Sequence, residues 1–339
     1  MSILILSRHL KLRIRTAAGF LLQASPRVFL VLLTGACLVF GPLSLAQKKK
    51  KGALEPQQTS QPPIRVQVDL VNLHTTVFDQ NGKIVPGLAK TDFTVFEDNV
   101  QQDIALFGVE TDTPVTVGIL IDTSGSMANS GKLEKAEEAA QLLAKALSPK
   151  DEIFVLGFTD QFYPLVDFTP ADTDFSRVLA RLVAQGGTSV GAGVEEAIFK
   201  MRDASNKKQA VVVISDGLDV PGGGVIDKIR SHEALVYAIG LKGVGGIMGL
   251  ASHLQALNVH GSSLNVYANE SGGKAIFVNS LDEVPKACQD IVYDLKGQYQ
   301  IGYYPSNPAR DGKYRRIKVQ VHRPEFTVRY RRGYYAPRR

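Results

Sequence analysis

The chain of 339 residues has no tryptophan and only two cysteines, Cys37 and Cys288. If Cys37 leaves with an N-terminal targeting segment, Cys288 has no intrachain disulfide partner. Charged residues make up 21% of the chain and hydrophobic residues 44%, which fits neither a disordered chain nor a protein with many membrane spans. The length exceeds what one core usually supports, so we expect more than one folding unit.

Acidic residues are absent from the first 46 positions, which hold five basic residues and then an apolar run at 28–40. This order, ending in small residues before position 47, is typical of a secretory signal peptide cleaved after Ala46. An uncleaved N-terminal anchor is the alternative, although Gly35 and the Gly41-Pro42 pair make a poor span. A lipid-modified Cys37 fits less well, because the apolar run continues past it. Each reading predicts an exported protein: periplasmic, in the cell envelope or secreted.

The formal net charge of +6 is concentrated at the two ends of the chain. Residues 52–312 carry 20 basic and 32 acidic side chains, whereas ten basic residues lie beyond position 312. The main part is therefore acidic, and no basic surface for nucleic acid is expected there. The basic C-terminal end is interpreted as solvated strand faces.

Two β-rich segments flank a longer α/β segment. A basic, proline-rich linker at 47–63 is expected to be disordered. Residues 64–70 alternate apolar and polar side chains, short β runs follow at 73–78 and 93–97, and Asn81-Gly82 is a hairpin signal. We therefore expect residues 64–110 to form a small β unit with these three strands. Candidate strands at 299–304, 314–321 and 326–330 form a C-terminal β segment, 299–339, that we expect to pack with residues 64–110.

Between them, residues 111–298 alternate strands and helices. This order predicts a doubly wound, mostly parallel sheet of the Rossmann-like kind, covered by helices on both faces. Residues 241–263 are rich in glycine and serine and are expected to form a long connection of functional importance. The expected strands lie at 115–121, 153–158, 210–214, 234–239 and 275–278, and the expected helices at 133–147, 175–183, 190–201, 225–231 and 281–295.

Oxygen-bearing side chains follow the ends of the predicted strands. Asp122, Ser124 and Ser126 come directly after the apolar strand 115–121, and Asp216 follows the strand 210–214. Thr188 lies in a loop between them in sequence. Ligands bind parallel sheets at the carboxyl ends of the strands, and hard divalent cations prefer oxygen ligands. We therefore predict one metal site made of these five side chains.

This constellation resembles the metal-ion-dependent adhesion site of von Willebrand factor type A and integrin I domains, with Asp122, Ser124 and Ser126 as its DxSxS motif. The resemblance implies a bound Mg²⁺, with Mn²⁺ or Ca²⁺ as alternatives. It implies direct ligation by Ser124 and Ser126, direct or water-mediated ligation by Thr188, and largely water-mediated contacts from Asp122 and Asp216. The remaining coordination position is left for an acidic side chain of a protein partner.

The resemblance extends over most of the mature chain. Residues 92–99 (DFTVFEDN), the stretch YQIGYYP at 299–305 and the later segments YRRIKVQV and RRGYY are similar to a bacterial, acidobacterial group described as VWFA-related. Similarity to that group implies a domain architecture rather than a particular activity.

Several of these residues and motifs allow other interpretations. The Asp-Ser run could cap the following helix. Ser189 lies in a GxSxG sequence, the nucleophile elbow of hydrolases, but that motif should follow a strand directly. Asp219 is either an assistant of the metal or a solvated loop acid. Tyr303, Tyr304, Tyr334 and Tyr335 line either a binding surface or the core. The six histidines lack zinc-ligand spacing, and the glycines at 240–249 do not form a dinucleotide-binding motif.

These observations predict an exported protein that is not an enzyme and that binds an acidic residue of a protein partner through a divalent cation, as an adhesion or scaffold protein. The residue 241–263 loop and the loop after Ser126 would contribute specificity. The alternative is a structural or assembly factor of the cell envelope in which the metal only stabilises the fold. A hydrolase that uses Ser189 is a third hypothesis. A membrane is expected to be contacted only through an uncleaved N-terminal segment.

Overall fold

The computed structural model describes residues 69–217, 221–241 and 262–338, and these described residues belong to one compact unit. The predicted signal peptide, the linker, nearly all of the strand at 64–70, Asp219 and most of the loop at 241–263 lie outside the described residues. Among the described residues, no helix is both long and apolar enough to cross a membrane.

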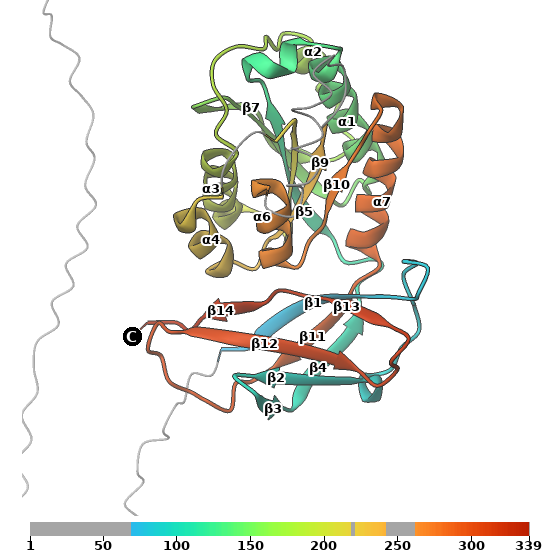
Figure 1. Cartoon of the computed structure of the whole chain (residues 1–339), viewed down its shortest axis with the longest axis vertical. Coiled ribbons are helices and arrows are strands. Elements are labelled where there is room, and N and C mark those ends of the chain that lie inside the picture. Colours follow the sequence, from blue (N-terminus) through green and yellow to red (C-terminus); the bar gives the residue numbers. More distant parts are fainter. Residues whose placement is uncertain (1–68, 218–220, 242–261, 339) are drawn as a thin grey trace, which may run out of the picture. The chain divides into compact units, whose positions relative to one another are not determined.

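A six-stranded sheet forms the centre of the α/β region (Figure 1). Its strand order is β10-β9-β8-β5-β6-β7, and all neighbouring pairs are parallel except β6 with β7. The mostly parallel doubly wound sheet predicted from the sequence is thereby confirmed. Its strands are β5 (Val115–Asp122), β6 (Glu152–Phe158), β7 (Phe162–Pro170), β8 (Lys208–Ser215), β9 (Leu235–Gly240) and β10 (Ala275–Phe277).

Helices cover both faces of this sheet, as Figure 1 shows with α1 and α7 on one side and α3, α4 and α6 on the other. Every residue of β5 is buried. Because strand side chains alternate, Ile119 and Ile121 pack with the α1 and α7 side, whereas Leu120 packs with the α3 side. The helices are α1 (Lys132–Ala146), α2 (Ser176–Leu179), α3 (Val190–Lys200), α4 (Gly223–Arg230), α6 (Ser263–Ser271) and α7 (Val284–Lys296), with short 3₁₀ turns η2 (Gly125–Ala128), η3 (Met201–Asp203) and η5 (Leu281–Glu283).

Three elements of the α/β region differ from the sequence prediction, and β3, β4 and β14 of the β region were not predicted. The helix expected at 175–183 is only the single turn α2, and the edge strand β7 was not predicted. Two prolines, Pro164 and Pro170, obscure the β7 pattern; proline is tolerated on edge strands because it has no N–H for the ladder. Helix α6 was not predicted; it begins at Ser263, the last residue of the expected loop, and the Ser262 hydroxyl caps it by accepting from Asn265 N at 3.4 Å.

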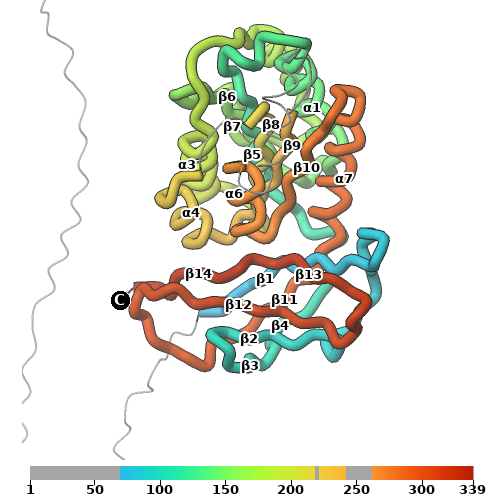
Figure 2. Tube along the Cα trace, viewed as in Figure 1, coloured from blue at the N-terminus to red at the C-terminus, as the bar shows by residue number. Residues whose placement is uncertain are grey.

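The β region consists of two four-stranded sheets, with orders β13-β1-β11-β4 and β14-β12-β2-β3. Figure 2 shows early strands of the chain, in blue to green, beside late strands, in red, in this region. The N- and C-terminal segments are therefore interleaved, since β1 pairs with β11 and β2 with β12. The strands are β1 (Val71–Phe78), β2 (Phe93–Glu97), β3 (Val100–Gln102), β4 (Ile104–Val109), β11 (Tyr299–Tyr303), β12 (Tyr314–Val321), β13 (Thr327–Arg329) and β14 (Gly333–Tyr335), and η1 (Lys90–Asp92) precedes β2.

The turn at Asn81-Gly82 forms as expected, with Gly82 at a φ of +75°. It does not close a regular hairpin, because only one bridge, from Phe78 to Ile84, links its two arms. Strand β1 instead takes both of its partners, β11 and β13, from the C-terminal segment.

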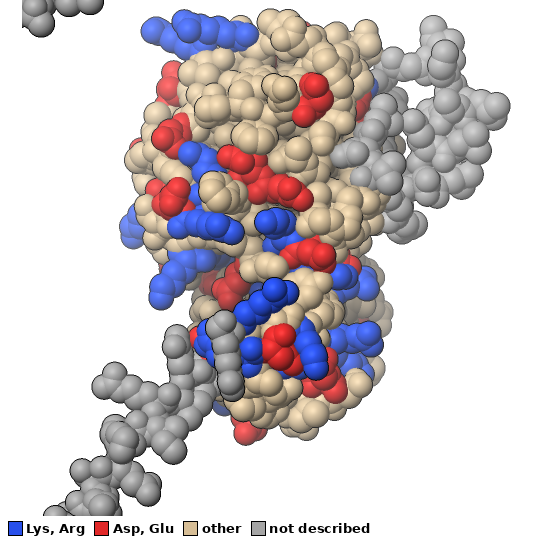
Figure 3. All heavy atoms as spheres, turned by 90° about the vertical axis from the view of Figure 1, so that its left-hand side faces the viewer, with Lys and Arg blue, Asp and Glu red and all other residues tan. Residues whose placement is uncertain are grey.

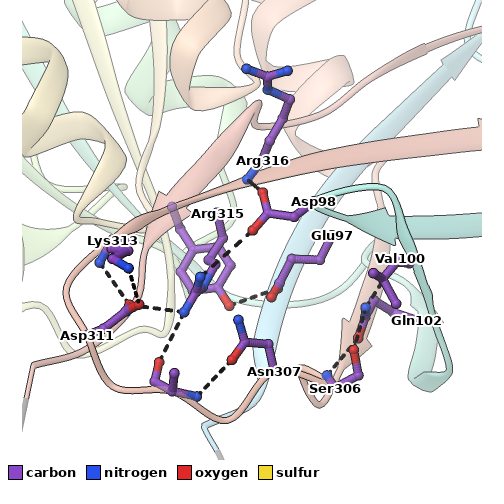
Figure 4. Close-up of polar contacts among 12 residues, drawn as sticks. Glu97, Asp98, Val100, Gln102, Ser306, Asn307, Asp311, Lys313, Arg315 and Arg316 are labelled. Atoms are coloured by element: carbon purple, nitrogen blue, oxygen red, sulfur yellow. Dashed lines mark hydrogen bonds and ion pairs between the residues drawn. The ribbon is translucent and has the colours of Figure 1, made fainter.

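Several charged and polar side chains inside the β region are paired with one another (Figure 4). The carboxylate of Glu97 is 3% exposed and accepts from the hydroxyls of Tyr303 and Tyr334, each at 2.9 Å. Arg315 donates to Asp311 at 3.0 Å and to the Ala309 carbonyl at 3.3 Å. Three of the four tyrosines weighed as binding or core residues thus have structural partners, while Tyr304 is 55% exposed.

Buried ion pairs link the β region to the α/β region. Lys208, the first residue of β8, donates to Glu110 at 2.5 Å and to the Leu295 carbonyl at 2.7 Å. His74 of β1 also contacts Glu110, at 2.9 Å. A second pair joins Arg329 of β13 to Asp294 of α7.

Candidate functional site

The site predicted from the sequence lies where the strand order reverses. Strand β5 lies between β6 and β8 in the sheet. After the carboxyl end of β5, the chain forms its next strands, β6 and β7, on one side of β5, and the following strand, β8, lies on the other side. Asp122 ends β5 and Asp216 directly follows β8, whose Ile214 pairs with Ile121. Open parallel sheets bind ligands at such a switch point.

Asp122 is fully buried, and both of its carboxylate oxygens are held by the chain. Oδ1 accepts from the backbone N–H of Ser124 at 2.8 Å, and Oδ2 accepts from the Ser215 hydroxyl at 2.5 Å. Burial raises the pKa of this carboxyl above its ordinary value, although the hydrogen bonds from Ser215 and Ser124 oppose the shift. Asp122 is therefore arranged to organise the loop rather than to offer a free oxygen.

Ser124 and Ser126 present their hydroxyls to each other, with the two Oγ atoms 3.1 Å apart. Ser124 precedes η2, but its side chain makes no capping hydrogen bond. Helix α1 begins only at Lys132, after Gly131, and that position has no side-chain cap either. The helix-capping interpretation is therefore wrong, because these hydroxyls do not accept from the N–H groups at a helix N-terminus.

The loop that carries Thr188 is held against the DxSxS loop by backbone hydrogen bonds. Gly125 N donates to Gly186 O at 3.1 Å, and Gln185 N donates to Thr123 O at 2.8 Å. Gly186 has a φ of +78°, a conformation that side chains with a Cβ rarely adopt. The structure thus brings the second loop beside the first and places Thr188 two residues from the contact.

Ser189, the hydrolase candidate, precedes α3. Its hydroxyl accepts from the backbone N–H of Ala192 at 3.4 Å, as a helix N-cap does. Its own N–H donates to Thr159 O at 2.8 Å. The serine follows a loop rather than a strand, unlike the serine of a nucleophile elbow.

Asp216 is 4% exposed, and its two oxygens differ. Oδ2 accepts from the ammonium of Lys132 at 3.0 Å, whereas Oδ1 is buried without any hydrogen-bond partner. A buried carboxylate oxygen without a partner is costly, so it marks a place where a ligand would be stabilising. Sequence reasoning missed both Lys132 and Ser215. The local sign of a role for Lys132 is that a cation stands as the first residue of a helix. No local pattern points to Ser215.

The residues present fit a small hard cation. The candidate donors are all oxygens: two carboxylates and three hydroxyls, one of the carboxylate oxygens being without a partner. In the described part of the chain, no group of three or more His, Cys, Asp or Glu side chains is arranged to hold a metal. Among the described residues, the oxygen donors at this sheet edge are these hydroxyls and two carboxylates, a set that suits Mg²⁺ with retained waters better than Zn²⁺.

Residues 117–218 match the family model of the von Willebrand factor type A domain. The match begins in β5 and ends just after Asp216, so it spans all five predicted site residues and the sheet edge where they lie. The chain thus contains a segment of this domain type. No curated protein matches the chain.

Similar solved structures include a von Willebrand factor type A protein from Catenulispora acidiphila, at 12% identity over 77% of this chain and 72% of that one, with a TM-score of 0.46. An aerotolerance-related membrane protein from Bacteroides fragilis is 22% identical over 52% of this chain and 98% of that one, with a TM-score of 0.41. The corresponding domain of the type V pili tip protein Mfa5 from Porphyromonas gingivalis is 15% identical over 53% and 94%, also at 0.41. Likenesses this distant say nothing about function.

Proposed function

We propose that this protein is an exported, non-enzymatic binding protein that holds one divalent cation, Mg²⁺ in the first instance, and uses it to bind an acidic side chain of another protein. Asp122, Ser124, Ser126, Thr188 and Asp216 are the proposed metal site. The observation that carries the proposal is the buried, partnerless Oδ1 of Asp216 beside a fully organised DxSxS loop.

The chemistry of the site favours an anionic ligand. A cation held by few carboxylates keeps open positions, and an oxygen anion is the preferred occupant. Acidic and basic side chains lie interspersed over the described part of the side that Figure 3 shows, and no patch of a single sign is seen there. The metal would supply the local attraction.

The alternative is an assembly factor of the cell envelope in which the metal serves only stability. The interleaved β region favours this candidate, because it offers a second surface outside the metal site. The two hypotheses differ in whether the removal of metal abolishes the binding of a partner or only lowers stability.

A pull-down with the mature chain from a proteome of the native host separates them. We expect a partner that is recovered with Mg²⁺ and lost with EDTA, and that Asp122→Ala does not recover. Circular dichroism and thermal unfolding must show that the variant remains folded, because Asp122 also holds Ser124 and Ser215.

The matched control is Asp290→Ala, which removes a carboxylate of α7 that lies on the surface in an ion pair with Lys286. It should recover the same partner as the wild type. If Asp122→Ala keeps both metal and partner binding, the site assignment is wrong. If the partner is recovered equally with EDTA, the assembly role is favoured.

A further inference from the structure

Lys132 stands where local electrostatics disfavour it. It is the first residue of α1, and the N-terminal end of a helix carries a partial positive charge that repels cations. Its side chain is only 14% exposed, although lysine is rarely buried without a partner. A residue that conflicts with its local environment usually has a role elsewhere in the fold.

The role is visible in its contact with Asp216. The ammonium donates to Oδ2 at 3.0 Å, from 84 positions away in sequence. Because that oxygen is engaged, the carboxylate cannot rotate freely and Oδ1 is held as the partnerless one. Lys132 thus occupies one oxygen of Asp216 and leaves the other available for a ligand.

The same contact changes the charge of the site. A divalent cation beside Asp122 and Asp216 alone would give a neutral group, and such a group has little need of a further anion. With the ammonium of Lys132 in contact with Asp216, the group carries one net positive charge. In a mostly buried environment that surplus is expensive, and a carboxylate from outside would neutralise it.

We propose that Lys132 is a positioning and specificity-determining residue that weakens the affinity for the metal alone and strengthens the coupling between the metal and an acidic ligand. This inference rests on the proposed function. It adds that the site is tuned to be filled by cation and carboxylate together rather than by the cation first.

The test is calorimetric titration of the mature chain with MnCl₂, with and without acetate as the simplest carboxylate, for the wild type, Lys132→Gln and Lys132→Arg. We expect Lys132→Gln to bind Mn²⁺ about ten-fold or more tightly than the wild type without acetate, because a nearby like charge is removed. Acetate should tighten Mn²⁺ binding by the wild type and by Lys132→Arg, and clearly less by Lys132→Gln.

Thermal unfolding in EDTA gives a readout without metal. In EDTA, Lys132→Gln should unfold at a lower temperature than the wild type, since Asp216 loses its partner. Mn²⁺ should raise the unfolding temperature of this variant by more than it raises that of the wild type. Lys135→Gln is the matched control: it removes one positive charge from the same helix, but its partner is Glu138. It should match the wild type in Mn²⁺ affinity and in the acetate effect.

The inference is overturned if Lys132→Gln binds Mn²⁺ no more tightly than the wild type does. It is also overturned if acetate tightens Mn²⁺ binding by Lys132→Gln as much as it does for the wild type. These failures are distinct from a failure of the proposed function, which would be the absence of Mn²⁺ binding by the wild type and by all variants.

Discussion

The buried pair of Lys208 and Glu110 makes a measurable prediction about stability. Their side chains are 1% and 3% exposed, and the ammonium also donates to the Leu295 carbonyl at 2.7 Å. Lys208→Met keeps the length and apolar volume of the side chain but leaves the Glu110 carboxylate with His74 as its remaining partner. Removing one member of a buried pair costs about 3–5 kcal/mol, so we expect a loss of that size in the free energy of unfolding.

The measurement is urea denaturation followed by circular dichroism at pH 7, with Lys207→Met as control because Lys207 is the exposed neighbour in sequence. The double variant Lys208→Met with Glu110→Gln should lose clearly less than the sum of the two single variants, because it no longer buries an unpaired charge. A loss below about 1 kcal/mol for Lys208→Met, or strict additivity in the double variant, would refute the reasoning.

The same pair predicts an acid dependence. Burial raises the pKa of Glu110, but His74 and Lys208 outweigh it, so the pKa is lowered overall. Because the folded pKa lies below the unfolded one, the stabilisation is present above pH 4.5 and is lost as the pH falls through the folded value. Glu110→Gln should lack this part of the acid transition.

Three further predictions concern separate parts of the molecule. Burial raises the pKa of Cys288 to about 12, so the stability that its thiol contributes is present below its ordinary pKa and is lost as the pH rises towards 12. The difference in unfolding free energy between the wild type and Cys288→Ala should therefore shrink from pH 9 to pH 11. A constant difference would contradict this. Gly186 has a φ of +78°, and a Cβ added there would lie 3.3 Å from Asp160 Oδ1. Gly186→Ala should therefore lower the free energy of unfolding by about 1–2 kcal/mol and weaken Mn²⁺ binding in titration. Normal binding and stability would show that the loop tolerates the strain. Arg329→Met leaves Asp294 buried without its cation, so urea denaturation should show a loss of about 3 kcal/mol or more, and a loss within experimental error would mean that the pair is not stabilising.

Local patterns in the sequence were sufficient to predict most of the α/β region. The run at 115–121 is apolar because β5 is covered on both faces, and α1 keeps apolar residues at helical spacing because one side packs on the sheet. Asp122 and Asp216 could be expected at one sheet edge because the carboxyl ends of parallel strands meet there. Where local signals were weak, as in β7 with its prolines and in the single turn α2, the prediction was wrong.

The lateral contacts were decided only by the tertiary structure. Nothing in the period of β1 indicates that its partners are β11 and β13 rather than the strand across the Asn81-Gly82 turn. The pairing of Lys132 with Asp216 spans 84 positions and that of Lys208 with Glu110 spans 98. Periodicity reports which face of an element is buried, but it carries no information about which distant side chain lies opposite. The sequence by itself therefore determined the elements and the candidate oxygen ligands, whereas the charges that would tune the metal position became apparent only when the chain was folded.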